Sequence, residues 1–153
     1  PGPSGNAGHI GHVGVPGATD RCACGLIGCV EAVASGPRTV AWARAQGWGG
    51  STGEDLAAAC RDGDEIALAA AHRSADAVGR AIAGATALLD VEVVAIGGGF
   101  VNVVPDYVER VAAPIAECDF PFVNTVRVVP SGLAGDGPLV GAAALALLPD
   151  RLG

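Results

Sequence analysis

The chain has 153 residues, of which 50% are hydrophobic and 16% charged, a balance that excludes an intrinsically disordered chain and fits one folded domain. The formal net charge of -7 argues against nucleic-acid contact, because an acidic surface repels phosphodiester backbones. Every apolar run is shorter than the roughly 18 residues of a membrane span, so we expect no membrane partner.

Five cysteines are distributed unevenly along the chain. Cys22, Cys24 and Cys29 fall within eight residues, whereas Cys60 and Cys118 are isolated. An odd number with one dense cluster argues against a secreted disulfide framework and predicts a metal site in a reducing cytoplasm. The chain has no methionine and no secretory signal segment, and we expect further residues upstream.

The first part of the chain predicts short elements around a long loop. Residues 9–15 read as a short strand or an extended segment, and residues 16–28 read as a loop because Pro, Gly, Thr, Asp and Cys give no periodicity. Helical turns are predicted at 29–34 and at 54–61, and the helix between them is expected to start at Ser35-Gly36-Pro37 and to end at Gln46-Gly47.

The second part predicts alternating helices and strands. The longest helix is expected to end near Asp90, and its inward stripe comprises Ile66, Ala69, Ala70, Val78, Ile82, Ala85 and Leu89. Residues 91–96 predict a buried parallel strand, 105–118 a helix, 125–129 a second strand, 130–137 a loop and 139–148 a last helix. This order predicts an α/β architecture. Cys60 and Cys118 occupy apolar helix positions and are expected in the core.

The strongest signal is the spacing His12-x9-Cys22-x-Cys24-x4-Cys29. Three thiolates and one imidazole complete the tetrahedral shell of a structural zinc ion. Gly25 and Gly28 flank the last two cysteines and allow a positive φ, so that the loop can fold back around one ion. The alternative is three free cysteines in a loop beside a solvent-facing histidine.

The run GHIGHVGVPGATDRCACGLIGCVEAVASGP, residues 8–37, resembles the zinc motif of the ROK family (repressors, open reading frames and kinases). Weaker similarity continues through AIGGG at 95–99 and through GDGPLVGAA at 135–143, whose small residues are expected to pack closely. The resemblance implies the C-terminal half of an actin-like (RNase H-like) ATPase fold. Residues 1–153 would form one C-terminal domain, with a zinc loop at about 9–31, an α/β remainder at 32–150, and the N-terminal domain absent.

The resemblance also assigns a sugar site. It implies that His12 binds zinc through one ring nitrogen and faces the sugar with the other, and that Glu31 accepts hydrogen bonds from sugar hydroxyls. Glu31 alone could equally be an ordinary helix-N-terminal glutamate. His9 stands where the family has a sugar-binding glutamate, so we expect an altered preference or a weaker site. The alternative for His9 is a solvated strand histidine.

For the nucleotide, the resemblance points to Gly97, Gly98 and Gly99. Glycine at the carboxyl end of a strand lets the backbone approach a ligand, although three glycines can equally form a tight turn. The phosphate-binding segments and the catalytic aspartate of the family lie in its N-terminal half. We therefore assign no catalytic residue in this chain and expect it to be inactive alone.

The resulting prediction is part of a cytoplasmic, homodimeric kinase that transfers phosphate from ATP, with Mg²⁺, to a hexose or N-acyl amino sugar. The alternative is a sugar-sensing repressor of the same family, whose DNA-binding part would lie upstream. A third reading, a free-standing zinc-knuckle interaction module, fits poorly with the acidic charge and the large α/β remainder. The sequence leaves the sugar, the hydroxyl attacked and the phosphoryl donor open.

Overall fold

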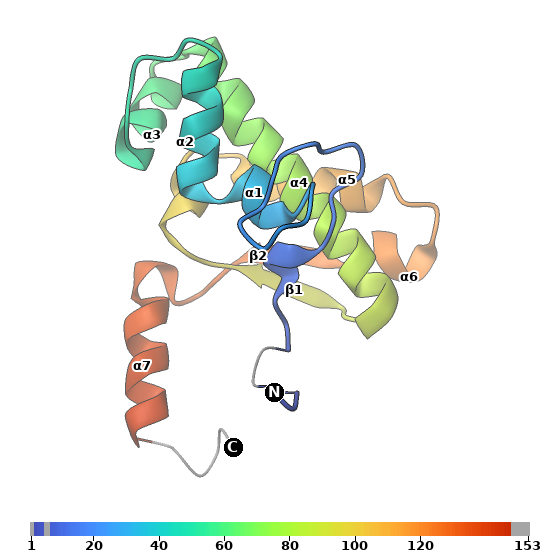
Figure 1. Ribbon diagram of the computed structural model, residues 1–153. Helices are drawn as coiled ribbons and strands as arrows, with labels where there is room; N and C mark the ends of the chain where they lie inside the picture. The colour runs from blue at the N-terminus through green and yellow to red at the C-terminus, as the bar shows by residue number, and fades with distance from the viewer. Residues whose placement is uncertain (1, 5–6, 148–153) are drawn as a thin grey trace.

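The computed structural model describes residues 2–4 and 7–147 as an α/β chain (Figure 1). The predicted order of helices around two strands is confirmed. The elements are η1 (Ile10–His12), α1 (Val30–Ala34), α2 (Gly36–Ala45), α3 (Gly53–Arg61), α4 (Glu65–Leu89), β1 (Val93–Ile96), η2 (Gly99–Asn102), α5 (Tyr107–Ala116), α6 (Pro121–Asn124), β2 (Arg127–Pro130), η3 (Ala134–Asp136) and α7 (Gly137–Leu147). Among the described residues, no helix has the length and apolarity that a membrane crossing needs.

The 25-residue helix α4 is the central element. It begins where the Asp64 side chain accepts hydrogen bonds from the backbone N–H groups of Ile66 and Ala67, both at 2.9 Å. It ends at Asp90, which has a left-handed φ of 52°. Helices α1, α2, α3 and α5 all pack against α4, which crosses the molecule from the α2–α3 end to α6 (Figure 1).

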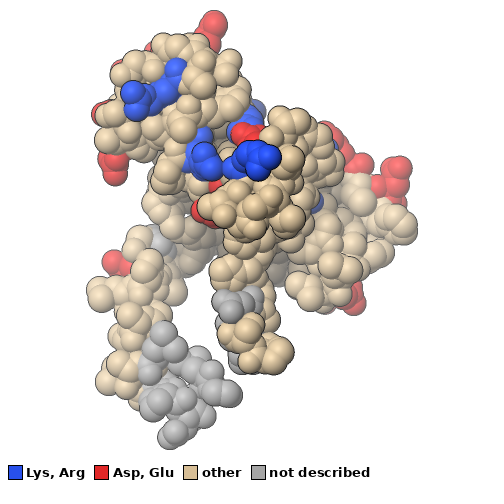
Figure 2. All heavy atoms as spheres, in the orientation of Figure 1, with Lys and Arg blue, Asp and Glu red and all other residues tan. Residues whose placement is uncertain are grey.

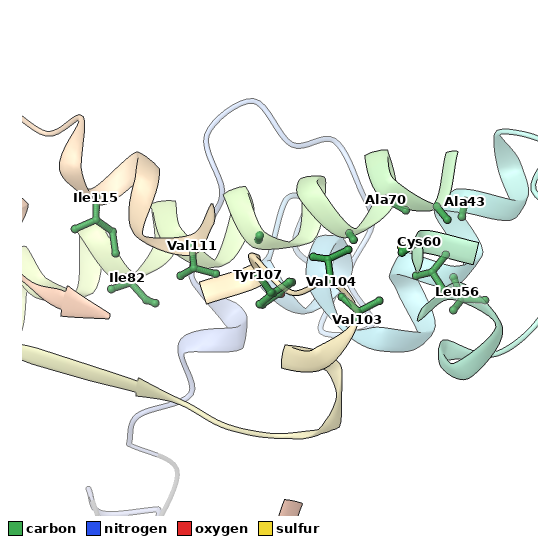
Figure 3. Close-up of a cluster of buried hydrophobic side chains, with 14 of the residues drawn as sticks. Ala43, Leu56, Cys60, Ala70, Ile82, Val103, Val104, Tyr107, Val111 and Ile115 are labelled. Carbon is green, nitrogen blue, oxygen red and sulfur yellow. The ribbon is translucent and has the colours of Figure 1, made fainter. Parts of the chain in front are cut away.

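The main core lies between α4, α3 and α5 (Figure 3). Leu56, Val111 and Ile115 are almost completely buried there. Cys60 is buried among them, as predicted, and Cys118 is half-buried against the same cluster. Their apolar surroundings explain both cysteines as packing residues.

The inward stripe predicted for α4 is only partly correct, since Ala69 and Leu89 are exposed. The reason is that α4 is buried on two sides. Ala67, Ala70, Ala71, Ala75 and Ile82 face the main core, whereas Ala77 and Ala81 face a second cluster with Val15, Val30, Val33 and Ala34. Because alanine side chains are small, other elements pack closely against α4 from two directions. The buried surface of α4 is therefore wider than the single stripe predicted from its sequence.

Strands β1 and β2 pair in parallel, as predicted, with Val93 opposite Arg127 and Ile96 opposite Pro130. The prediction that β1 is buried is wrong: Val93 is 42% exposed, and exposure alternates along the strand. Val94 and Ile96 pack against the core, and their neighbours point the other way. Helices therefore cover only one face of this strand pair among the described residues.

Residues 9–15 do not form the predicted strand. Ile10–His12 is a 3₁₀ turn, in which the N–H of His12 donates to the carbonyl of His9 at 3.1 Å. The end of the segment pairs with residues 28–30 through an isolated antiparallel bridge between Gly14 and Cys29, in which the N–H of Val15 donates to the carbonyl of Gly28 at 2.8 Å and the N–H of Val30 donates to the carbonyl of Val13 at 3.0 Å. A turn takes the place of a strand because this segment closes against a loop and has no neighbouring strand to extend.

The C-terminal elements add two further differences. The four-residue helix α6 was not predicted. Helix α7 extends away from the other helices (Figures 1 and 2), and Gly141, Ala142 and Ala143 are exposed, so the expected close packing of these residues is absent. Leu148, the predicted end of the last helix, and residue 150, the predicted domain boundary, lie outside the described residues.

Candidate metal centre

The structure brings His12, Cys22, Cys24 and Cys29 into one cluster. One ligand atom from each residue lies within 4.8 Å of the others. Nδ1 of His12 is 3.7 Å from Sγ of Cys22, and Sγ of Cys24 is 3.7 Å from Sγ of Cys29. Cys22 and Cys29 are buried, whereas Cys24 and His12 lie at the surface. These four side chains can hold one metal ion.

Backbone hydrogen bonds shape residues 9–29, which we call the metal loop. The N–H of Cys22 donates to the carbonyl of Leu26 at 2.9 Å, and that of Gly25 donates to the carbonyl of Cys22 at 3.1 Å. Gly25 and Gly28 have φ values of +94° and +78°, which confirms the positive φ expected for both. At Gly28 an added Cβ would lie 2.8 Å from the carbonyl oxygen of Ala18.

The thiols in this cluster have different acidities. The pKa of Cys24 is lowered from 9.0, mainly by a backbone hydrogen bond from Leu26 and then by the Cys22 side chain. Burial raises the pKa of Cys29 from 9.0 to about 11. Without a metal, Cys29 therefore keeps its proton at neutral pH, and a bound cation must displace that proton.

Two further predicted site residues lie beside the cluster. The ring of His9 is parallel to that of His12, with 5.8 Å between centroids and 6° between planes. Glu31, in the first turn of α1, brings its Oε2 atom within 3.3 Å of the position that a Cβ on Gly11 would occupy. The turn Ile10–His12 thus carries the imidazole of His12, follows His9 directly and borders the carboxylate. All three side chains are at the surface, where a polar ligand can reach them.

The three glycines predicted for nucleotide contact follow β1 at its carboxyl end. Gly98 has a φ of +100°, and a Cβ on Gly97 would lie 3.2 Å from Cβ of Ser131. Gly99 lines a groove of about 460 Å³ between α3 and η2, whose other lining residues are Gly53, Glu54, Ala57, Arg61, Phe100, Asn102 and Val103. None of these residues is a metal ligand, so the glycines belong to a different part of the surface from the metal loop.

The model of the ROK family matches residues 1–148 of this chain. Kanosamine kinase of Amycolatopsis mediterranei (strain S699) is 36% identical over 126 residues, which cover 82% of this chain and 42% of that protein. The chain thus spans less than half of this relative's length.

Two solved structures resemble the fold. The crystal structure of a ROK family glucokinase from Streptomyces griseus, in complex with glucose and AMPPNP, matches with a TM-score of 0.76 at 25% identity, covering 91% of this chain and 51% of that chain. A ROK family transcriptional regulator, a homolog of the E. coli MLC protein, matches with a TM-score of 0.68 at 27% identity, covering 79% and 33%. The predicted α/β fold of actin-like type is confirmed by these likenesses, and the chain belongs to the ROK family.

Proposed function

We propose that this chain forms the sugar-binding half of an ATP-dependent sugar kinase. The observation that carries the proposal is the convergence of His12 and three cysteines on one point, with the Glu31 carboxylate beside the same turn. The similarity to kanosamine kinase and to a glucokinase crystallised with glucose and AMPPNP supports a hexose or amino-sugar substrate.

The metal best suited to this cluster is zinc. Two thiolates that bind zinc at about 2.3 Å in a tetrahedron lie about 3.8 Å apart. The two sulfur atoms of Cys24 and Cys29, 3.7 Å apart, match this spacing. Four protein ligands leave no position for an activated water, so the ion is structural. It holds the metal loop closed and orients the imidazole of His12.

We assign sugar recognition to His12, Glu31 and His9. Because Nδ1 of His12 faces the sulfur of Cys22, its Nε2 is free to donate a hydrogen bond to a hydroxyl. The Glu31 carboxylate accepts from two hydroxyls at once. His9 offers both a donor and an acceptor where the family has an acceptor-only glutamate, and so alters the preference at one or two hydroxyls.

We assign nucleotide contact to Gly97, Gly98 and Gly99. The positive φ of Gly98 and the groove lined by Gly99 support an approach of ATP to this backbone. In kinases a Mg²⁺ ion accompanies the phosphates, and a carboxylate base accepts the proton of the attacked hydroxyl. We place that base, an aspartate, in the N-terminal half of the whole protein.

Other parts of the proposal rest on family resemblance alone. They are a single C-terminal domain over residues 1–153, with a zinc loop at about 9–31 and an α/β remainder at 32–150, a homodimer and a cytoplasmic location. The alternative is a sugar-sensing repressor, which the similarity to a transcriptional regulator keeps open. The groove beside Gly99 favours the kinase, because a sensor of sugar needs no nucleotide site.

The test is an ATP-coupled assay of the whole protein against glucose, other hexoses, amino sugars and N-acetylated amino sugars. We expect the wild-type protein to phosphorylate at least one of these sugars. The Glu31→Gln variant should have a KM for that sugar raised at least about 10-fold. The His9→Glu variant should rank the sugars in a different order. Glu65→Gln, which like Glu31 is an exposed glutamate in the first turn of a helix but lies outside both proposed sites, is the control for Glu31. Sugar-dependent DNA binding without phosphorylation would identify the repressor instead, and an unchanged ranking would remove the role of His9.

A further inference from the structure

Arg73, in the middle of α4, touches three segments that carry or flank the candidate site. Its Nη2 atom donates to Oδ2 of Asp20, in the metal loop, at 2.5 Å. Its Nη1 atom donates to the carbonyl oxygen of Val33, in α1, at 3.1 Å. Its guanidinium carbon lies 5.4 Å from the ring centroid of Trp42, in α2. The side chains of Arg73 and Asp20 are only 25% and 28% exposed.

Two of these contacts, those to Asp20 and Val33, are close in sequence to a residue of the site. Asp20 is two residues from Cys22, and its own carbonyl accepts from the N–H of Gly28, next to Cys29, at 2.8 Å. Val33 is two residues from Glu31. One side chain therefore connects the metal ligands on one side with the sugar-binding carboxylate on the other.

We propose that Arg73 is a positioning residue, which holds the metal loop and α1 in one arrangement and thereby sets the position of His12 relative to Glu31. The inference rests on the proposed function, because it names what fixes the geometry of that site. Arginine suits this role because its planar fork directs two donors at once, whereas lysine is a point charge. Figure 2 shows basic side chains with acidic atoms beside them over the part of the molecule where Figure 1 places α1 and α4.

An ordinary surface ion pair on the same helix provides the matched control. Arg80 donates to Asp76 one turn earlier on α4 at 2.8 Å, with side chains 43% and 50% exposed. That pair stays within one helix and holds no second segment, so its loss should leave the site unchanged. The difference between Arg73→Met and Arg80→Met isolates the positioning role from the general effect of removing an arginine.

The experiment compares wild type, Arg73→Met, Arg73→Lys, Asp20→Asn and Arg80→Met in the whole protein. Circular dichroism and thermal unfolding report the fold. Transfer of zinc to a chromogenic chelator reports the metal loop, and the KM and kcat for the best sugar report the site. Zinc release is read without turnover, so it tests Arg73 even where the sugar has not been identified.

Loss of a group that orients metal ligands typically weakens metal binding by about 10–100-fold. We therefore expect Arg73→Met to release zinc faster than wild type by about 10-fold or more. The sugar KM should rise by a similar factor, with a smaller change in kcat. Arg73→Lys, which can keep one contact, should fall between this variant and wild type, and Arg80→Met should match wild type. Asp20→Asn should release zinc faster as well. If Arg73→Met does not fold, the zinc release of Asp20→Asn tests whether the contact between Arg73 and Asp20 holds the metal loop.

Two results would overturn the proposal. One is zinc release and sugar KM in Arg73→Met and Asp20→Asn equal to those of Arg80→Met, which would leave Arg73 in a purely structural ion pair. The other is a loss of thermal stability alone, with zinc release and sugar KM unchanged. A separate measurement on the wild-type protein tests the proposed function itself. That function would be wrong if the wild-type protein held no metal and phosphorylated no sugar.

Discussion

Gly28 occupies a position in the metal loop that no other residue fills without strain. Its φ is +78°, and an added Cβ would meet the carbonyl oxygen of Ala18 at 2.8 Å. We predict that Gly28→Ala destabilises the loop by about 1–3 kcal/mol and weakens metal binding. Gly25→Ala is the control, because φ there is +94° but an added Cβ meets nothing within 4 Å. Chemical unfolding and zinc titration of both variants measure the difference, and equal effects would contradict this reading.

Metal binding should strengthen as pH rises. Because burial raises the pKa of Cys29 to about 11, this thiol is protonated at neutral pH in the metal-free protein. Binding must then release a proton, so the apparent affinity increases with pH up to about 11 and decreases towards acid. Competition titrations between pH 6 and pH 8, with proton release measured by calorimetry in two buffers, test this. An affinity independent of pH would show that the cysteines are not ligands.

At the same scale, residue type and spacing predicted which side chains gather, and the cluster of His12 with three cysteines is confirmed. Arg73 could not be found in this way. Its partners Asp20 and Val33 lie 53 and 40 residues away in sequence, and no local pattern relates them. The inward stripe predicted for α4 does not include Arg73, and helical periodicity says nothing about hydrogen bonds from this side chain to a distant loop.

At the scale of elements, the contact between α4 and α5 depends on a glycine. A Cβ on Gly79 would lie 2.2 Å from the carbonyl oxygen of Val111 and 2.5 Å from Cγ of Pro114. We predict that Gly79→Ala destabilises the protein by about 1–3 kcal/mol through forced separation of the two helices. Gly84→Ala, on the same helix with open space around it, should stabilise by up to about 1 kcal/mol. Urea unfolding of the two variants should give shifts of opposite sign, and shifts of the same sign would contradict the packing.

Elements with strong local signals were predicted, and those set by distant contacts were not. Helices α3 and α4 begin at Thr52 and Asp64, whose side chains cap them. The turn Ile10–His12 was mistaken for a strand because Ile10, Val13 and Val15 suit either state. Only the closing of the metal loop, through the bridge between Gly14 and Cys29, selects the turn.

On the scale of the whole molecule, the burial of β1 could not be predicted from its composition. A run of apolar residues indicates a strand covered on both faces, yet Val93 is 42% exposed in this chain. Helix α7 likewise exposes Leu139 and Leu147, at 73% and 77%. Apolar surface of this extent is typical of a surface that a further domain or subunit covers.

These exposed surfaces agree with the proposal that the chain is one half of a sugar kinase. We therefore predict that residues 1–153 produced alone transfer no phosphate to any sugar in an ATP-coupled assay, because the proposal places the base and the phosphate-binding segments in the N-terminal half of the whole protein. The whole protein, assayed in parallel, is the control. Turnover by the isolated chain would show that its own carboxylates complete an active site.

The central claim is that His12, Cys22, Cys24 and Cys29 hold one zinc ion that orients the sugar site. X-ray absorption spectroscopy of the purified protein at the zinc edge tests this claim most directly. We predict one zinc per chain, with three sulfur ligands at about 2.3 Å and one nitrogen ligand at about 2.0–2.1 Å, all lost in Cys29→Ser. Protein without stoichiometric metal, or a shell of oxygen ligands that Cys29→Ser leaves unchanged, would contradict the claim.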